Sequence, residues 1–424
     1  MKTFFSRLHV LQAILSFAVL CAGLIPHAQA ADAGAWTPSW TASPQPVWGG
    51  DFVLPLGLPA TLRDQTVRQV VRASVGGPRV RIVLSNEYGT QALQIGAAHI
   101  APAGAAAGSI GGPGQAVTFG GQPTVTVPAG APVISDPIEI AVAPLDRLAI
   151  SLYLPQTAPL TTIHWEGLQP AQIAAGNVAS ASTIKADSIV NSRLFLSAVL
   201  VEAAPGTRSV VAFGDSITDG AASTPGTDQR WPDFLARRLA GRNVAVINAG
   251  ISGGRVLKNH MGMNALARFD RDVLSQPGIS SVVLLMGIND ISWPGSTFEP
   301  NEPATQADAL IAGYRQLIAR ARSRGVRIVG ATLTPFEGAL TMPGSPIANY
   351  YSPAKDAVRQ RINHWIRSSG EFDAVADFDA VVRDPQNPLR ILPAYDSGDH
   401  LHLGDAGNQA VAESINLKLL LGER

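Results

Sequence analysis

Hydrophobic positions recur with a period of two in the first half of the chain, between about residues 36 and 200. Val80, Ile82 and Leu84 occupy every second position of one segment, and residues 148–154 repeat this spacing. Such alternation places the hydrophobic side chains on one face of a β-strand. Because glycine and proline turns separate these short segments, this half predicts an antiparallel β-sandwich or jelly roll.

A different rhythm begins near residue 205, where short apolar runs alternate with helical patterns. Hydrophobic spacings of three and four predict a helix over residues 310–321, and Ser352 followed by Pro353 is a favourable helix start. We expect the last helix over residues 404–421. Strands that alternate with helices indicate a parallel sheet covered on both faces, here with about five strands in a flavodoxin-like order. The apolar runs that predict these strands are Ser209–Phe213, Val244–Ile247, Ser280–Met286, Val326–Leu333 and Ala374–Phe378.

The beginning of the chain has the features of a secretory signal peptide. Lys2 and Arg7 provide a basic start, an apolar stretch follows over residues 10–24, and residues 28–30 form an A-x-A cleavage site. The apolar stretch is shorter than the roughly 20 residues that span a bilayer, which argues against a transmembrane anchor. We therefore expect an exported protein, either secreted or periplasmic.

Three segments are predicted: a signal peptide at residues 1–30, a β-sandwich accessory domain at 31–204 and an α/β domain at 205–424. The 32 basic and 32 acidic residues form no basic block, so nucleic acid is not an expected partner. No later segment is apolar for long enough to insert stably into a membrane. The single cysteine, Cys21, lies in the predicted signal peptide, so no disulfide or thiolate metal site is expected after cleavage.

Candidate chemistry collects at the ends of the predicted strands. Ser216 follows the first strand of the second half, Gly253 follows the second, and Asn289 follows the third. Asp399 and His402 come after the fifth strand and before the last helix. In an open parallel sheet, ligands bind beyond the carboxyl ends of the strands. We therefore expect all five residues at one edge of the sheet.

These residue types supply the groups that acyl transfer needs. A carboxylate three positions before a histidine can orient its ring, so Asp399 and His402 form a candidate acid–base pair for a Ser216 nucleophile. The backbone N–H groups of Ser216 and Gly253 and the side-chain amide of Asn289 can form an oxyanion hole. This chemistry requires no metal and no organic cofactor.

The same blocks resemble the GDSL/SGNH hydrolase family over roughly residues 208–421. Gly214-Asp215-Ser216-Ile217, Gly253, Gly287-x-Asn289-Asp290 and Asp399-x-x-His402 have the order and spacing of its motifs. The resemblance implies a three-layer, flavodoxin-like SGNH hydrolase domain with a Ser216 nucleophile. It also implies an Asp399–His402 pair and Gly253 and Asn289 as oxyanion donors. Members are metal-free esterases, lipases, thioesterases or carbohydrate deacetylases. The β-rich half is similar to the additional domain of a secreted subset related to aryl esterases and xylan-side-chain esterases.

Three residues offer alternative assignments. Ser252 lies in a G-x-S-x-G sequence typical of the α/β-hydrolase nucleophile, but we interpret it as a loop residue that shapes the turn at Gly253. His400 is a second candidate base, although an adjacent aspartate is poorly placed to bond its ring. His164 is expected to pack in the β-rich half, with a secondary hypothesis that its segment lines the substrate cleft. Asp215 and Asp219 are expected to organise their loop through hydrogen bonds.

The main functional hypothesis is a secreted serine esterase that hydrolyses carboxylic esters, such as carbohydrate O-acetyl or aryl esters. One alternative is a lysophospholipase or thioesterase acting on lipid acyl groups. Another is a carbohydrate-binding or surface-interaction protein with a degenerate hydrolase scaffold. The expected partner is a small-molecule or polysaccharide ester. The sequence does not indicate whether the protein is a monomer or an oligomer. Two long loops rich in aromatic residues, 291–305 and 334–351, are candidates for substrate specificity.

Overall fold

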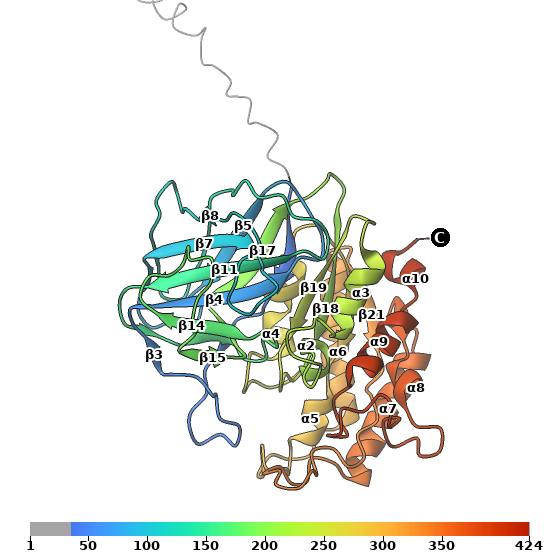
Figure 1. The fold of residues 1–424 in the computed structure, drawn as a ribbon. Coiled ribbons are helices and arrows are strands. Elements are labelled where there is room, and N and C mark those ends of the chain that lie inside the picture. Colours follow the sequence, from blue (N-terminus) through green and yellow to red (C-terminus); the bar gives the residue numbers. More distant parts are fainter. Residues whose placement is uncertain (1–34, 424) are drawn as a thin grey trace, which may run out of the picture. The chain divides into compact units, whose positions relative to one another are not determined.

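A computed structural model describes residues 35–423 of the chain. The predicted signal peptide at residues 1–30, including Cys21, lies outside these residues. Residues Trp36–Arg424 form a compact unit of their own. This unit combines a β-rich region with an α/β region (Figure 1).

Two antiparallel sheets dominate the β-rich region (Figure 1). The larger sheet has the order β15-β14-β4-β11-β7-β8, with strands β15 (Ser188–Val190), β14 (Ala171–Ala175), β4 (Gln65–Arg72), β11 (Arg147–Leu154), β7 (Ala97–Pro102) and β8 (Gln115–Ala116). The second sheet has the order β1-β17-β5-β10, with strands β1 (Trp36–Thr41), β17 (Leu196–Glu202), β5 (Val80–Ser85) and β10 (Pro132–Ile134). Shorter pairings involve β2 (Gln45–Pro46), β3 (Thr61–Leu62), β6 (Leu93–Ile95), β9 (Val125–Val127), β12 (Ala158–Pro159), β13 (Thr162–His164) and β16 (Arg193–Leu194).

The alternation seen in the sequence explains the packing of these sheets. In β5, the side chains of Val80, Ile82 and Leu84 are fully buried, whereas Arg81 between them is partly exposed. The buried side chains share one hydrophobic core with residues of the larger sheet, including Ile150 and Leu152 of β11. The predicted β-rich sandwich is confirmed.

The α/β region contains a five-stranded parallel sheet with the order β19-β18-β20-β21-β22. This is the predicted flavodoxin-like order, because the second strand in sequence forms the edge beside the first. The observed strand ends differ from the predicted ones by a few residues at most. The strands are β18 (Arg208–Gly214), β19 (Val244–Gly250), β20 (Ile279–Leu285), β21 (Arg327–Ala331) and β22 (Ala374–Ala376).

Helices cover this sheet and supply the turns at its carboxyl ends (Figure 1). They are α2 (Ser216–Asp219), α3 (Trp231–Leu239), α4 (Ala265–Phe269) with the π-helical turn η1 (Asp270–Leu274), α5 (Ile288–Ser292), α6 (Ala307–Ser323), α7 (Pro353–Ser368), α8 (Phe378–Val382), α9 (Asp405–Ser414) and α10 (Leu417–Leu421).

Capping residues account for several helix boundaries. Ser352 caps α7 through a hydrogen bond from the backbone N–H of Lys355, and Pro353 is the first helical residue, as predicted. The single helix predicted over residues 404–421 is wrong, because α9 and α10 are separate helices. Ile415 between them has an extended backbone (φ −64°, ψ 119°) and is buried, and Asn416 caps the start of α10. Burial of Ile415 and a new side-chain cap thus compensate for the interrupted helical hydrogen bonds.

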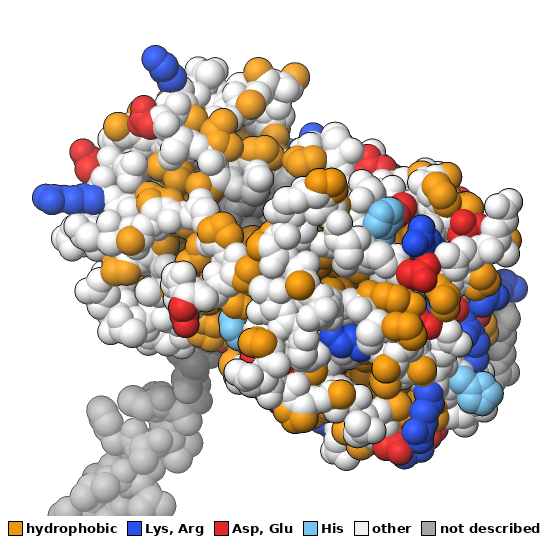
Figure 2. Space-filling view, turned by 90° about the horizontal axis from the view of Figure 1, so that it is seen from below, with side chains coloured by type: hydrophobic (Ala, Val, Ile, Leu, Met, Phe, Trp, Pro, Cys, Tyr) orange, Lys and Arg blue, Asp and Glu red, His pale blue; other side chains and the backbone are white. Residues whose placement is uncertain are grey.

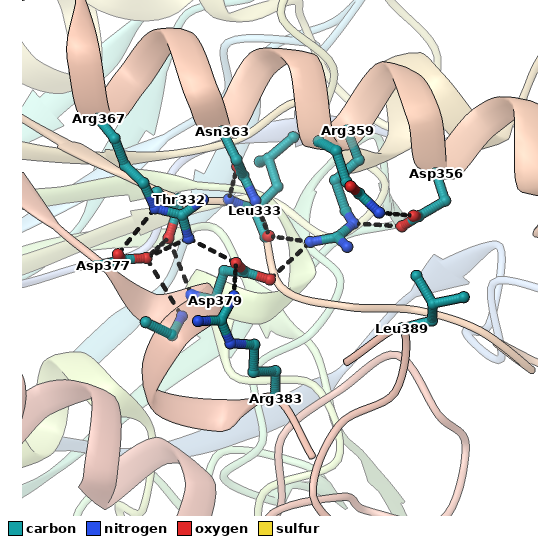
Figure 3. A network of polar contacts seen from close by, with 12 residues as sticks. Thr332, Leu333, Asp356, Arg359, Asn363, Arg367, Asp377, Asp379, Arg383 and Leu389 are labelled. Carbon is teal, nitrogen blue, oxygen red and sulfur yellow. Dashed lines mark hydrogen bonds and ion pairs between the residues drawn. The ribbon is translucent and has the colours of Figure 1, made fainter. Parts of the chain in front are cut away.

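A partly buried polar network ties α7 to the ends of two strands (Figure 3). Arg359 donates hydrogen bonds to the carbonyl of Leu333 (3.1 Å) and to Asp379 (2.7 Å). Arg367 contacts Asp379 (2.5 Å) and Asp377 (2.6 Å). Leu333 follows β21, and Asp377 follows β22. The network therefore fixes the chain directly after β21 and β22, at the carboxyl edge of the sheet.

The β-rich and α/β regions are joined by polar contacts inside the unit. Thr41 donates a hydrogen bond to the carbonyl of Asn248 at 3.0 Å, and Arg72 pairs with Asp233 at 3.0 Å. The boundary predicted between residues 204 and 205 coincides with the change from β17 to β18. Whether the two segments are independent domains stays a prediction.

Candidate active site

The predicted site residues lie at the carboxyl ends of the parallel strands. Ser216 begins α2 after β18, Asn289 lies in α5 after β20, and Gly253 follows β19. In Figure 1, α5 lies on the lower side of the sheet. Figure 2 views the molecule from that side, and hydrophobic side chains are spread over this face.

Ser216, His402 and Asp399 form a continuous hydrogen-bonded chain. The hydroxyl oxygen of Ser216 lies 2.8 Å from Nε2 of His402, and Nδ1 of His402 lies 2.6 Å from a carboxylate oxygen of Asp399. Ser216 is 6% exposed and lies at the first position of α2. Asp215 precedes it and caps this short helix by accepting a hydrogen bond from the N–H of Ile217 at 3.1 Å. A proton can pass from Ser216 to His402 across this contact.

Local hydrogen bonds shape the turn that carries the aspartate and the histidine. One carboxylate oxygen of Asp399 accepts the backbone N–H groups of Leu401 (2.9 Å) and His402 (2.8 Å). The other oxygen remains available for the His402 ring. The three-residue spacing seen in the sequence therefore allows one carboxylate to organise the turn and orient the imidazole.

The environment moves the pKa values of this pair in opposite directions. Burial disfavours the charged form of Asp399, but the charge of His402 and the hydrogen bonds from its ring and backbone outweigh burial and lower the pKa of Asp399. Burial also acts to lower the pKa of His402, whereas the charge and hydrogen bond of Asp399, with smaller effects of Glu166 and Asp215, raise this pKa overall. Asp399 is therefore ionised over the range in which His402 titrates.

Gly253 occupies a turn that favours glycine. Its φ is +72°, in the left-handed region, and an added Cβ atom would lie 2.3 Å from Sδ of Met261 and 3.1 Å from Trp293. Glycine tolerates this backbone conformation and leaves room for Met261. The backbone at residue 253 can thus approach the cavity beside Ser216 closely.

The amide of Asn289 is held in a fixed orientation. Its oxygen accepts hydrogen bonds from the indole N–H of Trp293 (3.0 Å) and the hydroxyl of Tyr350 (2.7 Å). Its nitrogen donates one hydrogen bond to the carbonyl of Gly254 at 3.1 Å. The second amide hydrogen has no hydrogen-bond partner among residues 35–423. It is therefore available to a ligand, because Asn289 lines the cavity.

A largely apolar cavity of about 470 Å³ opens in front of Ser216 and His402. Its size lies within the range typical of small-molecule sites. One wall comes from the two loops whose aromatic residues the sequence pointed to, and another comes from the β-rich region. The lining includes Trp293, Phe298, Leu340, Met342, Ile347 and Tyr350 from the loops, and Leu54, Trp165 and Glu166 from the β-rich region.

Sequence reasoning did not identify Trp165, Glu166 or the part played by Tyr350. For Trp165 and Glu166, the only indication in the sequence was the hypothesis that the segment around His164 lines the cleft. The ring nitrogens of His164 itself lie 3.1 Å from the carbonyl oxygen of Ser43 and 3.0 Å from Asp219. His164 is therefore a packed histidine that joins the two regions, whereas its neighbours in sequence reach the cavity.

The alternative nucleophile and base are engaged elsewhere. Ser252 donates its hydroxyl hydrogen bond to Asp219 at 3.1 Å, and its backbone N–H bonds the same carboxylate at 3.0 Å. His400 pairs with Asp396 at 2.5 Å, and its side chain is 43% exposed. The geometry thus brings His402 rather than His400 to Ser216. Asp219 bonds His164 and the loop before Gly253, whereas the expectation was that it organises its own loop.

No helix among residues 35–423 has the length and apolar character needed to cross a membrane. Within the same residues, no cluster of three or more histidine, cysteine, aspartate or glutamate side chains is placed to hold a metal ion.

Comparison with known families identifies the α/β region. Residues 212–410 match the model of the GDSL-like lipase/acylhydrolase family. The chain carries a GDSL-like lipase/acylhydrolase domain. The matched residues include Ser216, Gly253, Asn289, Asp399 and His402. With this domain, the chain is a carboxylic ester hydrolase.

Solved structures resemble the chain over about half of its length. The native aryl esterase of M. smegmatis is 16% identical with a TM-score of 0.40, and the match covers 50% of this chain and all of that one. The acetyl xylan esterase AlAXEase is 22% identical with a TM-score of 0.36, covering 49% of this chain and 96% of that one. A GDSL-like lipase from Bacteroides thetaiotaomicron VPI-5482 is 19% identical with a TM-score of 0.38, covering 51% and 89%. None of the curated proteins matches the chain.

Proposed function

We propose that this GDSL-like hydrolase is an exported serine esterase that acts through an acyl-enzyme on Ser216. The observation that carries the proposal is the hydrogen-bonded chain from the Ser216 hydroxyl through His402 to Asp399 (2.8 Å and 2.6 Å), at the floor of the cavity. The sequence of residues 1–30 supports export, because it has the order of basic, apolar and small residues typical of a signal peptide.

Acylation begins when Nε2 of His402 takes the hydroxyl proton of Ser216 while the serine oxygen bonds to the ester carbonyl carbon. The resulting tetrahedral intermediate carries a negative oxygen. The C–O bond to the alcohol then breaks, and the proton on His402 passes to the leaving alcohol oxygen. Asp399 remains ionised throughout and stabilises the imidazolium ion that forms.

The negative oxygen needs donors that are in place before the reaction. The free amide hydrogen of Asn289 and the backbone N–H groups of Ser216 and Gly253 are the proposed donors. Trp293 and Tyr350 fix the amide of Asn289 through its oxygen, so little reorganisation is required when charge develops.

Deacylation repeats the same steps with water. His402 removes a proton from a water molecule as the water oxygen attacks the acyl carbon. The bond to Ser216 then breaks, and the serine oxygen recovers its proton from His402. The products are a carboxylic acid and free enzyme.

The proposed substrate is an ester with a compact aryl or short acyl group, which the aromatic and apolar wall of the cavity can contact. Trp293 and Phe298 stack at 4.7 Å in its wall, and Met342 and Ile347 add further apolar surface. A complete set of reactive groups in a closed hydrogen-bond chain argues against a degenerate scaffold. A screen of acetyl, long-chain acyl and acetylated-polysaccharide esters would define the acyl preference. A clear preference for long-chain acyl esters would favour the alternative of a lysophospholipase.

Labelling by an organophosphonate tests the nucleophile. We expect mass spectrometry to find the label on Ser216 and Ser216→Ala to remain unlabelled, with kcat lowered by about 10⁶-fold. Ser252→Ala is the matched control, because Ser252 lies in the same cavity but bonds Asp219 instead of a histidine. It should still take the label at Ser216. A label on Ser252, lost in Ser252→Ala, would overturn the assignment.

A further inference from the structure

Glu166 is an acidic side chain in the cavity that the proposed ester hydrolysis does not use. It follows β13 in the β-rich region and lines the same cavity as Ser216 and His402. Its carboxyl group makes no hydrogen bond or salt bridge with any of residues 35–423. Glu166 is partly buried, so its carboxyl group faces the cavity without a protein partner and is open to a ligand or water.

The other polar side chains described along the cavity wall already have partners. Ser252 bonds Asp219, and Tyr350 bonds Asn289. Ser345 accepts the N–H of Ile347 at 3.2 Å. Among the described residues of the lining, Glu166 carries the one carboxyl group, and this group has no hydrogen-bond partner in surroundings that are otherwise mostly apolar. Such isolated polar groups commonly set ligand orientation and specificity.

The segment that carries Glu166 is held rigidly. The backbone N–H of Trp165 bonds the side chain of Gln45 at 2.8 Å, and its indole N–H bonds the carbonyl of Leu56 at 3.1 Å. His164 on the other side is fixed by Ser43 and Asp219. The carboxyl group is thus presented by a preorganised segment, which reduces the entropy lost when it binds a substrate group.

The position of Glu166 indicates which part of an ester it meets. Burial lowers the pKa of His402, but Asp399 and, to a smaller extent, the charge of Glu166 raise it overall. His402 is the group that returns a proton to the leaving alcohol, whereas Gly253 and Asn289 lie on the side of the carbonyl oxygen. Because Glu166 and His402 line the same cavity, an alcohol portion bound beside His402 shares that cavity with this carboxyl group.

We infer that Glu166 determines specificity by accepting a hydrogen bond from a hydroxyl group on the alcohol portion of the ester. The substrate class is thus a partial ester of a polyhydroxy alcohol, and this inference rests on the proposed esterase function. Burial and the charge of Asp219 raise the pKa of Glu166, with His402, Arg230 and His164 acting in the opposite direction. A carboxyl group with a raised pKa is better suited to a hydroxyl donor than to a permanent cation.

Three acetate esters, of which the hydroxyethyl and propyl esters match in size, test the inference without any mutation. In 2-hydroxyethyl acetate, the alcohol carries a donor; in 2-methoxyethyl acetate, it carries an oxygen without a donor; in propyl acetate, it carries neither. We expect kcat/KM for the hydroxyethyl ester to exceed both others by about tenfold or more, as a hydrogen bond to a carboxyl group predicts. Equal values for the hydroxyethyl and propyl esters would overturn the inference.

Two substitutions at Glu166 separate a hydrogen bond from a charge effect. Glu166→Leu should abolish the preference, so that kcat/KM for the hydroxyethyl ester becomes equal to kcat/KM for propyl acetate in the same variant. Glu166→Gln, which keeps an acceptor oxygen, should retain part of the preference and should shift the acid limb of the pH profile to lower pH. Glu139→Leu, at a glutamate whose side chain is 74% exposed, is the control. A preference that persists in Glu166→Leu would overturn the inference.

A cation site is the competing outcome. Acetylcholine and its neutral isostere, 3,3-dimethylbutyl acetate, distinguish it. If the wild type prefers acetylcholine and both Glu166→Gln and Glu166→Leu lose that preference, Glu166 pairs with a cation and the hydroxyl inference is wrong. Failure of the esterase proposal has a different result, since the wild type would then hydrolyse none of the five esters and Ser216 would not be labelled.

Discussion

Two carboxyl groups beside Ser216 occupy opposite environments. Asp399 accepts hydrogen bonds from His402 and two backbone N–H groups, which stabilise its charge. Asp215 is fully buried, and one of its carboxylate oxygens has no hydrogen-bond partner. Burial accordingly raises the pKa of Asp215 to about 7, whereas that of Asp399 is lowered. The same residue type thus keeps its charge at one position, whereas at the other position burial favours the neutral form.

The pH dependence of the reaction is set by His402. The neutral ring accepts the Ser216 proton, so kcat/KM should fall as the pH drops through the pKa of His402. Because Asp399 raises this pKa, the midpoint of the acid limb should lie above the ordinary histidine value of about 6.5. Steady-state kinetics between pH 5 and 9 on a non-ionising ester provide the measurement.

Removal of the Asp399 charge provides the corresponding control. Asp399→Asn should move the acid limb to lower pH and reduce kcat by about 10⁴-fold, because the ring loses both its orientation and its charge partner. A flat wild-type profile between pH 5 and 8 would contradict the role of His402.

At the scale of single residues, the sequence predicted the site residues whose positions follow from nearby residues or from the end of a strand. Asp399 and His402 share one turn, and Ser216 and Asn289 directly follow strands. Glu166 could not be predicted in the same way, because nothing near it in sequence is chemically related to Ser216. Its place in the cavity depends on the packing of the β-rich region against the α/β region.

At the scale of elements, the loop after β19 depends on backbone conformation as much as on side chains. Gly253 has a left-handed φ, and a Cβ atom added there would lie 2.3 Å from Sδ of Met261. Asp219 anchors the preceding residue, Ser252, through both its backbone and its hydroxyl group. The loop is therefore fixed on both sides of the N–H group that is proposed to bind the oxyanion.

A pair of glycine substitutions separates backbone strain from loss of function. Gly253→Ala and Gly325→Ala both place alanine at similar left-handed φ values, +72° and +68°, but only at Gly253 does the new Cβ meet other atoms. Both should lose about 1–2 kcal/mol of stability from the unfavourable φ. Only Gly253→Ala should also lose activity, by at least about tenfold in kcat, because the loop must move away from Met261.

Urea denaturation and steady-state kinetics on the two variants provide the measurements. Equal activity of both variants would show that the position of residue 253 does not matter for the reaction.

The boundaries of elements were predictable where local signals are strong. Ser352 and Pro353 begin α7 at the predicted residue. The interruption between α9 and α10 was missed, because the hydrophobic pattern continues through Ile415 while burial of that residue requires an extended backbone. Tertiary packing there outweighs the helical tendency of the surrounding residues.

At the scale of the whole unit, Asp228 joins the two regions. Its side chain is 7% exposed and pairs with Arg147 at 2.5 Å and Arg72 at 3.8 Å. It also accepts a hydrogen bond from Gln169 at 2.6 Å. The three partners belong to the β-rich region, whereas Asp228 precedes α3. Such contacts couple the stability of the two regions.

Coupling of this kind predicts cooperative unfolding. The wild type should unfold in one calorimetric transition, and Asp228→Asn should lower its stability by about 1.5–3 kcal/mol without splitting that transition. Asparagine tolerates the positive φ of residue 228 (+56°), so the effect should reflect the lost charge. Two separate transitions in the wild type would instead support independent domains at residues 31–204 and 205–424.

The sequence by itself determined the two folds and a set of candidate reactive groups. Periodicity specifies which face of each strand or helix is buried, and the strand-to-loop order of a parallel sheet places Ser216, Asn289 and His402 at one edge. Only the tertiary structure decided which histidine reaches Ser216, how Asn289 is oriented, and that Glu166 enters the cavity. These features depend on side-chain packing between segments far apart in sequence, for which local patterns carry no signal.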